Sequence, residues 1–193
     1  QPADREQVVG ARAVTDRQSK QLSRLVDDLL DVSRITTGKL TVQLEAIDLQ
    51  TVVARAVETS RPLLDERQIR LEVSYPERPI VLNADLTRMA QVLSNLLNNA
   101  AKFSMAGGTV LLTARHDARE VEIAVKDSGV GIPADALPHV FDMFSQGDKH
   151  LGRSLGGLGI GLTLVKRLVE LHGGSVEARS GGSQPGSDFI IRL

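Results

Sequence analysis

Hydrophobic residues recur at helical spacing near the start of the chain. Residues 4–35 are polar and helix-forming, and their second half carries an apolar stripe at the i, i+3, i+4, i+7 and i+8 positions, which comprises Leu22, Leu25, Val26, Leu29 and Leu30. We expect one long helix here, ended by a turn at residues 36–39. The stripe is equally consistent with packing against the body of the same chain and with dimerisation as a coiled element.

The rest of the chain mixes short strands with helices. Asp48 suits a helix N-cap, and we expect its helix to end before Pro62, because a proline cannot donate the amide hydrogen bond of a helix interior. Further helices are expected over residues 85–102, as a short turn after Pro133, and up to His172 as a C-terminal cap. Strands are expected at residues 40–44, 69–73, 80–82, 109–115, 121–127, 175–179 and 188–193.

The order of these elements predicts the fold class. Strands outnumber helices, and regular alternation of strand, helix and strand is missing. We therefore predict an α/β (α+β) two-layer sandwich, with a mixed sheet and helices on one face. Residues 1–37 would form the preceding helix and residues 38–193 the globular domain.

Composition excludes several classes of function. The net charge of -1 gives no overall attraction to nucleic acid, and one Tyr, four Phe and no Trp leave few platforms for stacking bases, so we expect no nucleic-acid partner. The absence of cysteine excludes disulfides, thiolate metal sites and cysteine nucleophiles. No signal peptide or long apolar span is visible, so we expect a soluble, cytoplasmic portion of a protein.

Amides and a cation share one face of the helix expected over residues 85–102. Asn95 and Asn99 are four residues apart, and Lys102 follows three residues later. Amide oxygens are hard ligands that suit Mg²⁺, and a lysine supplies a point charge for phosphate. Taken alone, the same pattern more often only solvates an exposed helix end.

A carboxylate ends the strand expected over residues 121–127. Alternation along the strand places Asp127 on the inward face, where it needs a hydrogen-bond donor such as the exocyclic amine of adenine. Gly129 and Gly131 remove side chains where a planar base would approach, and Ile132 would form an apolar wall. A simple Asp-Ser-Gly turn is an equally good interpretation.

Glycines precede the last helix at positions 156, 157, 159 and 161. They put a flexible loop at a helix N-terminus, where free amides and the positive end of the dipole suit a phosphate. The pattern is neither a Walker A loop nor a dinucleotide fingerprint. Lys149 and Arg153 make the preceding segment locally basic, although most basic loop residues are only solvated.

In this order, the motifs resemble the ATP-binding catalytic domain of sensor histidine kinases, within the group that also contains type II topoisomerases, Hsp90 chaperones and MutL mismatch-repair proteins. Residues 95–102 are similar to the N box of that family, residues 127–131 to its G1 box, residues 141–144 to its F box and residues 156–161 to its G2 box. The resemblance covers nearly the whole chain. It implies a Bergerat-type fold with ATP and Mg²⁺ as cofactors.

The resemblance also implies roles for individual residues. Asn95, Lys102 and Arg153 would be catalytic, Asn95 and Asn99 would hold Mg²⁺, and residues 145–157 would form a lid over ATP. The implied nucleotide contacts are Asn99, Lys102, Phe103, Asp127, Gly129, Gly131, Ile132, Phe144, Gly157, Leu158, Gly159, Gly161 and Leu162.

Residues 24–34 resemble the second helix of the dimerisation and phosphotransfer hairpin of the family. The first helix, which should carry a histidine followed by an acidic residue, is expected to lie outside these 193 residues. His116 and Asp117 match that short pattern, but we interpret them as a polar turn between strands. The expected partners are the phosphoacceptor helix of a bacterial parent kinase, a response regulator reached indirectly and a second copy of the full-length parent. Such a parent can be anchored in the inner membrane.

The residue at position 95 differs from that of similar ATPases, and this difference affects the expected mechanism. Similar ATPases that hydrolyse ATP carry Glu where this chain has Asn95, and asparagine cannot act as a general base. We therefore expect the pocket to hold ATP with little hydrolysis and to keep the γ-phosphate for a histidine from outside. Two alternatives stay open: an ATPase of the same group, and a nucleotide-gated interaction module in which residues 4–35 bind a partner.

Overall fold

A computed structural model describes the chain at residues 26, 29–31, 33–34, 37–117, 120–145, 159–181 and 185–193. Two compact units make up the chain, residues 1–40 and residues 41–193. The described residues of the first unit up to Arg34 are helical, and the predicted turn is present, with Thr37 donating to the Ser33 carbonyl and Gly38 at φ +65°. Of the predicted stripe, Leu22 and Leu25 lie outside the described residues.

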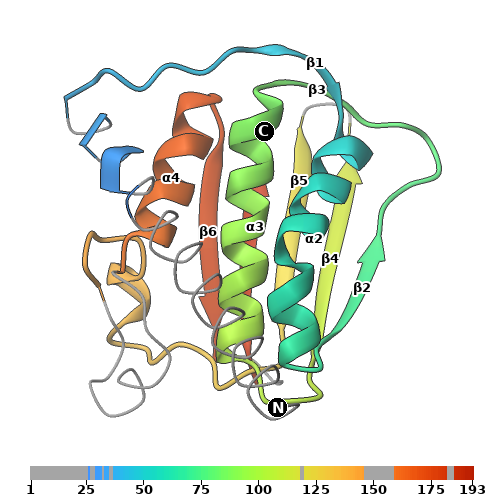
Figure 1. The fold of residues 1–193 in the computed structure, drawn as a ribbon, viewed down its shortest axis with the longest axis vertical. Coiled ribbons are helices and arrows are strands. Elements are labelled where there is room, and N and C mark those ends of the chain that lie inside the picture. The colour runs from blue at the N-terminus through green and yellow to red at the C-terminus, as the bar shows by residue number, and fades with distance from the viewer. Residues whose placement is uncertain are drawn as a thin grey trace, which may run out of the picture. The chain divides into compact units, whose positions relative to one another are not determined.

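The second unit is an α/β sandwich (Figure 1). Its elements are β1 (Glu45–Asp48), α2 (Leu49–Glu66), β2 (Arg70–Ser74), β3 (Val81–Ala84), α3 (Leu86–Phe103), β4 (Thr109–His116), β5 (Val121–Asp127), the 3-10 helix η1 (Leu137–His139), α4 (Gly161–Leu171), β6 (Ser175–Ser180) and β7 (Ser187–Arg192). The main sheet has the order β2-β4-β5-β7-β6, in which only the β2–β4 pair is parallel. A separate antiparallel pair joins β1 and β3.

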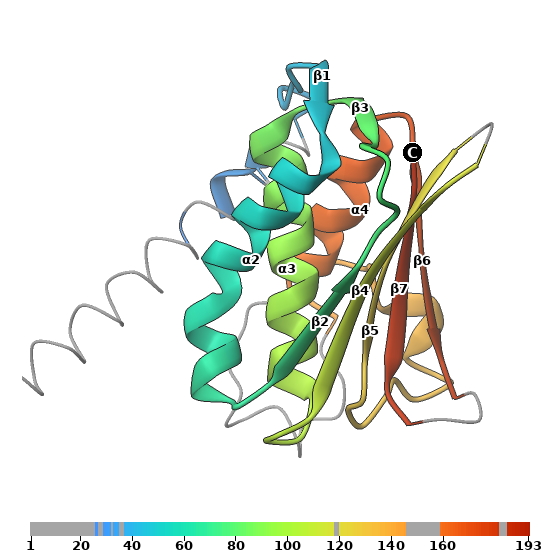
Figure 2. The ribbon, with the colours of Figure 1, turned by 90° about the vertical axis from the view of Figure 1, so that its right-hand side faces the viewer.

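The helices α2, α3 and α4 cover one face of the five-stranded sheet (Figure 2). The predicted fold class, a mixed sheet with helices on one face, is therefore confirmed. Strand β5 shows that one face of the sheet is buried and the other is less buried, because every second residue from Val121 to Asp127 is buried. The middle helix α3 is buried along a wide stripe that includes Met89, Leu93 and Leu97. None of the helices in the described ranges is long and apolar enough to cross a membrane.

A hydrogen-bonded junction joins the start of α3 to the end of α4. Asp85 caps α3 by accepting from the Arg88 amide at 3.0 Å, and its own amide donates to Nε2 of His172 at 3.0 Å. The other ring nitrogen of His172 lies 2.7 Å from the Leu168 carbonyl, so His172 is the C-cap that was predicted. Burial alone would raise the pKa of Asp85, but the amides of Gln43 and Arg88 help to lower it below its usual value.

Two expectations about element boundaries were wrong. Residues 40–44 form no strand; the strand begins at Glu45, and the amide of Gln43 donates to the Asp85 carboxylate at 3.0 Å instead of to a neighbouring strand. Helix α2 also continues through Pro62 to Glu66. Pro62 is on the exposed side of the helix. The carbonyl one turn earlier, which a proline cannot bond, can therefore be hydrated there. The fully buried Leu64 packs the last turn against the core.

The junction at His172 predicts a measurable loss of stability. Replacing His172 with alanine removes the acceptor for the Asp85 amide and the donor to the Leu168 carbonyl, so the free energy of unfolding in urea should fall by about 1–2 kcal/mol. The matched control is His116→Ala, at an exposed position at the end of β4, which should change that free energy by less than about 0.5 kcal/mol. Equal effects of the two substitutions would contradict the interpretation.

Candidate functional site

The amide residues predicted for metal binding lie on one face of α3. Asn95 and Asn99 are both partly buried. The amide nitrogen of Asn95 is buried and has no hydrogen-bond partner among the described residues. Gly161, the first residue of α4, faces this side chain, because a Cβ on Gly161 would lie 4.0 Å from Cγ of Asn95. Since the two ends of an amide are distinguished only by their hydrogen bonds, this unpaired end suits a bound group that accepts from it or is ligated by its oxygen.

Lys102 and Phe103 close the carboxyl-terminal end of α3. The ammonium of Lys102 lies 4.8 Å from the centre of the Phe103 ring, which is a cation–π distance. Burial lowers the pKa of Lys102 from its ordinary value, because the charged form loses solvation. Phe103 itself is 43% exposed. A phosphate or another anion beside Lys102 would restore the interaction that burial removes.

Asp127 ends β5 as a buried carboxylate, as strand alternation predicted. Only 4% of the residue is exposed. One carboxylate oxygen accepts from the Gly129 amide at 2.7 Å, and the other accepts from the hydroxyl of Ser187 on β7. These two donors account for the burial of a charge that is expensive without partners. The contact with Ser187 was missed from the sequence, because 60 residues separate it from Asp127.

Glycines surround Asp127 because the backbone segments approach closely. A Cβ on Gly186 would lie 1.9 Å from the Asp127 carbonyl oxygen, and the φ of Gly186 is +112°. A Cβ on Gly129 would lie 2.3 Å from the Phe103 carbonyl oxygen. That carbonyl also accepts from the Val130 amide at 3.3 Å. The loop after β5 is therefore fastened to the end of α3, and larger residues cannot replace these two glycines without moving the backbone.

The segment of residues 141–144 is attached to the start of α4. Thr163 donates from its hydroxyl to the Phe141 carbonyl at 2.9 Å, and the Phe144 amide donates to the Gly159 carbonyl at 3.1 Å. The ring of Phe141 packs edge-on against Phe189, with centroids 6.2 Å apart. Phe144 itself has φ +62° and is 61% exposed.

The first turn of α4 has no side-chain cap. Its N-cap residue is Ile160, and no side chain among the residues that the structure describes bonds the first amides of the helix. Leu162 lies in this turn and is partly buried. Such a turn leaves amide donors and the positive end of the helix dipole available to an anion. The other predicted members of this region, Arg153, Gly157 and Leu158, lie outside the described residues.

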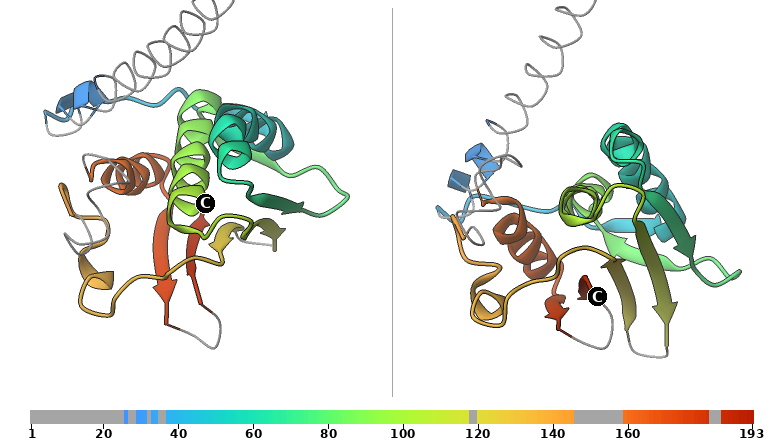
Figure 3. Two further views of the ribbon diagram at one scale, coloured as in Figure 1. Left: turned by 60° about the horizontal axis from the view of Figure 1, so that its bottom comes forward. Right: turned by 90° about the horizontal axis from the view of Figure 1, so that it is seen from below.

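These parts meet along one side of α3. The loop after β5 passes the lower end of α3 in Figure 1 on its way to η1, and the view from below in Figure 3 shows α4 beside α3. Asn95 and Phe103 are eight residues apart, which on a helix is about 12 Å. One end of this site contains Asp127 and the glycine loop, and the other end contains Asn95 opposite the start of α4.

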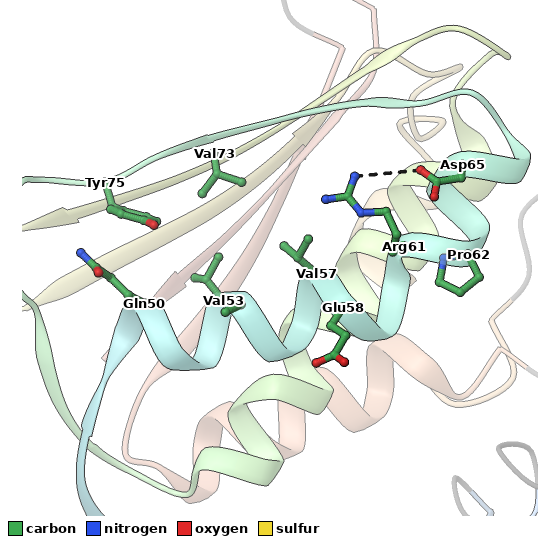
Figure 4. A pocket seen from close by; sticks show the side chains of 10 residues that line it. Gln50, Val53, Val57, Glu58, Arg61, Pro62, Asp65, Val73 and Tyr75 are labelled. Carbon is green, nitrogen blue, oxygen red and sulfur yellow. Dashed lines mark ion pairs between the residues drawn. The ribbon is translucent and has the colours of Figure 1, made fainter.

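The structure also has an open groove away from the predicted site residues. This groove of about 670 Å³ runs between α2 and β2, with Val53, Val57, Val73 and Tyr75 among its lining residues (Figure 4). None of the predicted site residues lines this groove. Its charged side chains include Arg61 and Asp65, which lie 4.0 Å apart and neutralise each other. The site predicted on α3 is therefore separate from this groove.

Known proteins are similar to this chain in sequence. A family model described as histidine kinase-, DNA gyrase B-, and HSP90-like ATPase matches residues 84–193. The chain is similar to the circadian input-output histidine kinase CikA of Synechococcus elongatus, with 37% identity over 174 residues, covering 89% of this chain and 23% of that protein. It is also similar to the sensor protein DivL of Caulobacter vibrioides, with 37% identity over 173 residues, covering 90% of this chain and 22% of that protein.

Solved structures agree with the curated relatives. The mycobacterial sensor histidine kinase MprB is 30% identical with a TM-score of 0.65, over 78% of this chain and 97% of that one. Full-length ShkA in complex with AMPPNP is 30% identical with a TM-score of 0.76, over 92% of this chain and 36% of that one. The chain spans less than a quarter of the length of the curated relatives CikA and DivL.

The half-buried charge of Lys102 predicts a cost in stability without a ligand. Because burial lowers the pKa of Lys102 in the folded state, the protonated form destabilises the fold below that pKa, and the cost disappears as the pH rises toward the ordinary lysine value. Lys102→Met should therefore raise the free energy of unfolding at pH 7, and the gain should shrink as the pH approaches 10.5, the ordinary lysine pKa, in urea titrations at several pH values. Lys166→Met, at an exposed position on α4, should leave it unchanged, and a loss of stability in Lys102→Met would contradict this account.

Proposed function

Because the chain belongs to the family of histidine kinase-, DNA gyrase B- and HSP90-like ATPases, we propose that it binds Mg-ATP and transfers the γ-phosphate to a histidine on a separate helix. The resemblance to sensor histidine kinases that the motifs predicted is confirmed, and the chain is a protein-histidine kinase ATP-binding domain. Its phosphoacceptor, its response regulator and its homodimeric parent remain proposals, as does the assignment of residues 1–37 to the dimerisation hairpin.

The observation that supports the adenine site best is the buried Asp127. Its carboxylate has two fixed donors and still has lone pairs to accept from an exocyclic amine. Guanine carries a carbonyl oxygen at the corresponding position, which the carboxylate would repel, so the site would select adenine. Gly129 and Gly131 would let the loop pack tightly beside the base, because their missing Cβ atoms would collide with the Phe103 carbonyl and the Ser180 hydroxyl. Ile132 would form an apolar wall, and Phe103 and Phe144 would add apolar contacts.

The phosphates would lie between α3 and the start of α4. The uncapped amides of the first turn of α4, near Gly161 and Leu162, would donate to phosphate oxygens, with the charge of Lys102 beside them. Gly157, Leu158, Gly159 and Arg153 would complete the phosphate side. Asn95 and Asn99 fit a Mg²⁺ site, because their amide oxygens are hard ligands for this cation and no hydrogen bond between the buried Nδ2 and the described residues fixes the orientation of the Asn95 amide. When bound, Mg²⁺ neutralises phosphate charge and orients the leaving group.

The residues of this chain would position the nucleotide more than activate it. Asn95 cannot take a proton from water, so the side chain at this position provides no base for hydrolysis. A histidine nucleophile that approaches from outside needs only a fixed γ-phosphate and neutralised charge, which the α4 turn and Lys102 would supply. The ATP analogue in the related ShkA structure fits this proposal.

A single substitution tests the adenine site. In Asp127→Asn, the side-chain oxygen can still accept from the Gly129 backbone amide, and the side-chain nitrogen can donate to a reoriented Ser187 hydroxyl. The fold should therefore survive. An amide nitrogen cannot accept from adenine, and Mg-ATP affinity measured by calorimetry should fall from the micromolar range by at least about a hundredfold. Asp188→Asn, on the adjacent position of β7, removes a carboxylate outside the site and should bind as the parent does. Equal affinity for both variants would refute the adenine site.

A second experiment distinguishes transfer from hydrolysis. With radiolabelled ATP and Mg²⁺, the chain alone should gain no stable label and should release little free phosphate. Adding the phosphoacceptor hairpin of a related sensor kinase should label the hairpin, and the same hairpin with its histidine replaced by alanine should stay unlabelled. Stable labelling of the chain alone would overturn the proposal, and rapid steady turnover of ATP would favour the ATPase alternative.

A further inference from the structure

We propose that Ser180 is a positioning residue of the nucleotide site, whose hydroxyl holds the backbone of the loop after β5 in place. The inference rests on the proposed function, because that loop, residues 128–132, is where the base would bind. Ser180 ends β6 and does not belong to any of the sequence motifs that predicted the site. It would act through the loop and not by touching the nucleotide.

The hydroxyl of Ser180 joins two separate backbone segments. Its oxygen accepts from the Ile132 amide at 2.8 Å, and its hydrogen is donated to the Gly186 carbonyl at 2.9 Å. Both bonds have the length of well-formed hydrogen bonds. Ile132 and Ser180 are 48 residues apart, so this contact ties the far end of the loop to the sheet. The hydroxyl uses its donor and one of its acceptor sites in these two bonds.

A second serine lies directly opposite on the neighbouring strand. Ser180 and Ser187 form the last pair of the β6–β7 ladder, so their side chains point to the same side of the sheet. Ser187 donates to the carboxylate of Asp127, which is the residue before the loop, and Ser180 accepts from Ile132 at the end of the loop. The pair of serines therefore fastens both ends of one short segment to the same rung of the sheet.

The Ser180 hydroxyl lies in a closely packed region, so its position constrains the neighbouring backbone. Gly131 has φ +76°, and a Cβ at this residue would lie 2.8 Å from the Ser180 oxygen and 3.1 Å from the Gly186 carbonyl oxygen. A Cβ on Gly186 would in turn collide with the carbonyl of Asp127. Ser180 does not bond Asp127, whose donors are Gly129 and Ser187, so loss of the Ser180 hydroxyl should loosen the end of the loop at Ile132 and leave the carboxylate in place.

The test compares Ser180→Thr with Ser180→Val in the full 193-residue chain. Threonine and valine have nearly the same shape and both suit a strand, but only threonine keeps the hydroxyl, so their difference isolates the two hydrogen bonds. Ser175→Ala, at an exposed position at the other end of β6, is the control for a general effect on this strand.

The first readout needs no nucleotide. Amide hydrogen exchange of Ile132 should be at least about tenfold faster in the valine variant than in the threonine variant, while the ladder amide of Ile190 exchanges equally in both. The second readout is the affinity for ADP by calorimetry. The valine variant should bind about five- to twentyfold more weakly, and the threonine and Ser175→Ala variants should stay within about twofold of the parent.

The outcomes separate this inference from the proposed function. If the parent chain does not bind ADP, the proposed function fails, and Ile132 exchange alone decides whether Ser180 holds the loop. If the parent binds ADP and the threonine and valine variants behave alike in both readouts, whether both weakened or both unaffected, the positioning role of Ser180 is refuted. Faster Ile132 exchange with weaker ADP binding only in the valine variant supports it.

Discussion

The burial of one carboxylate constrains the whole site. Asp127 is almost fully enclosed, so the fold must bring donors to both of its oxygens. The Gly129 amide supplies one donor from the next turn, and Ser187 supplies the other from a strand 60 residues away. Bringing that strand close forces backbone contact at position 186, which only glycine permits. The carboxylate, the glycines and the hairpin of β6 and β7 therefore depend on one another.

Helix α3 shows how stability and ligand binding compete within one element. One face packs into the core with large apolar residues such as Leu93 and Leu97. The other face keeps Asn95 with an unpaired buried amide end and Lys102 with a pKa lowered by burial. Neither feature stabilises the domain without a ligand. The unpaired amide of Asn95 and the lowered pKa of Lys102 are both explained if bound phosphates and a cation supply the missing partners. Sites that are preorganised for a ligand commonly cost the unbound protein some stability in this way.

Local patterns predicted the elements better than their ends. Strand alternation placed Asp127 inward, and the caps predicted at Asp48 and His172 are present in the structure. Boundaries depended on contacts that are distant in the sequence. Residues 40–44 alternate like a strand, but the amide of Gln43 is taken by the cap residue Asp85. Pro62 failed to end α2 because tertiary packing of the following turn outweighs its local preference.

The sequence by itself determined the family, the fold class and the residues that carry charge, amides and glycines, because these follow from residue type and short spacing. The tertiary structure alone decided which of them share one site. It brought Gly161 opposite Asn95 and fastened the loop after β5 to β6 and β7 through Ser180 and Ser187. A serine has no distinctive local pattern, and its role arises only when a strand 48 to 60 residues away folds against the loop. Long-range pairing in a mixed sheet creates such contacts, and no short window of sequence contains both partners.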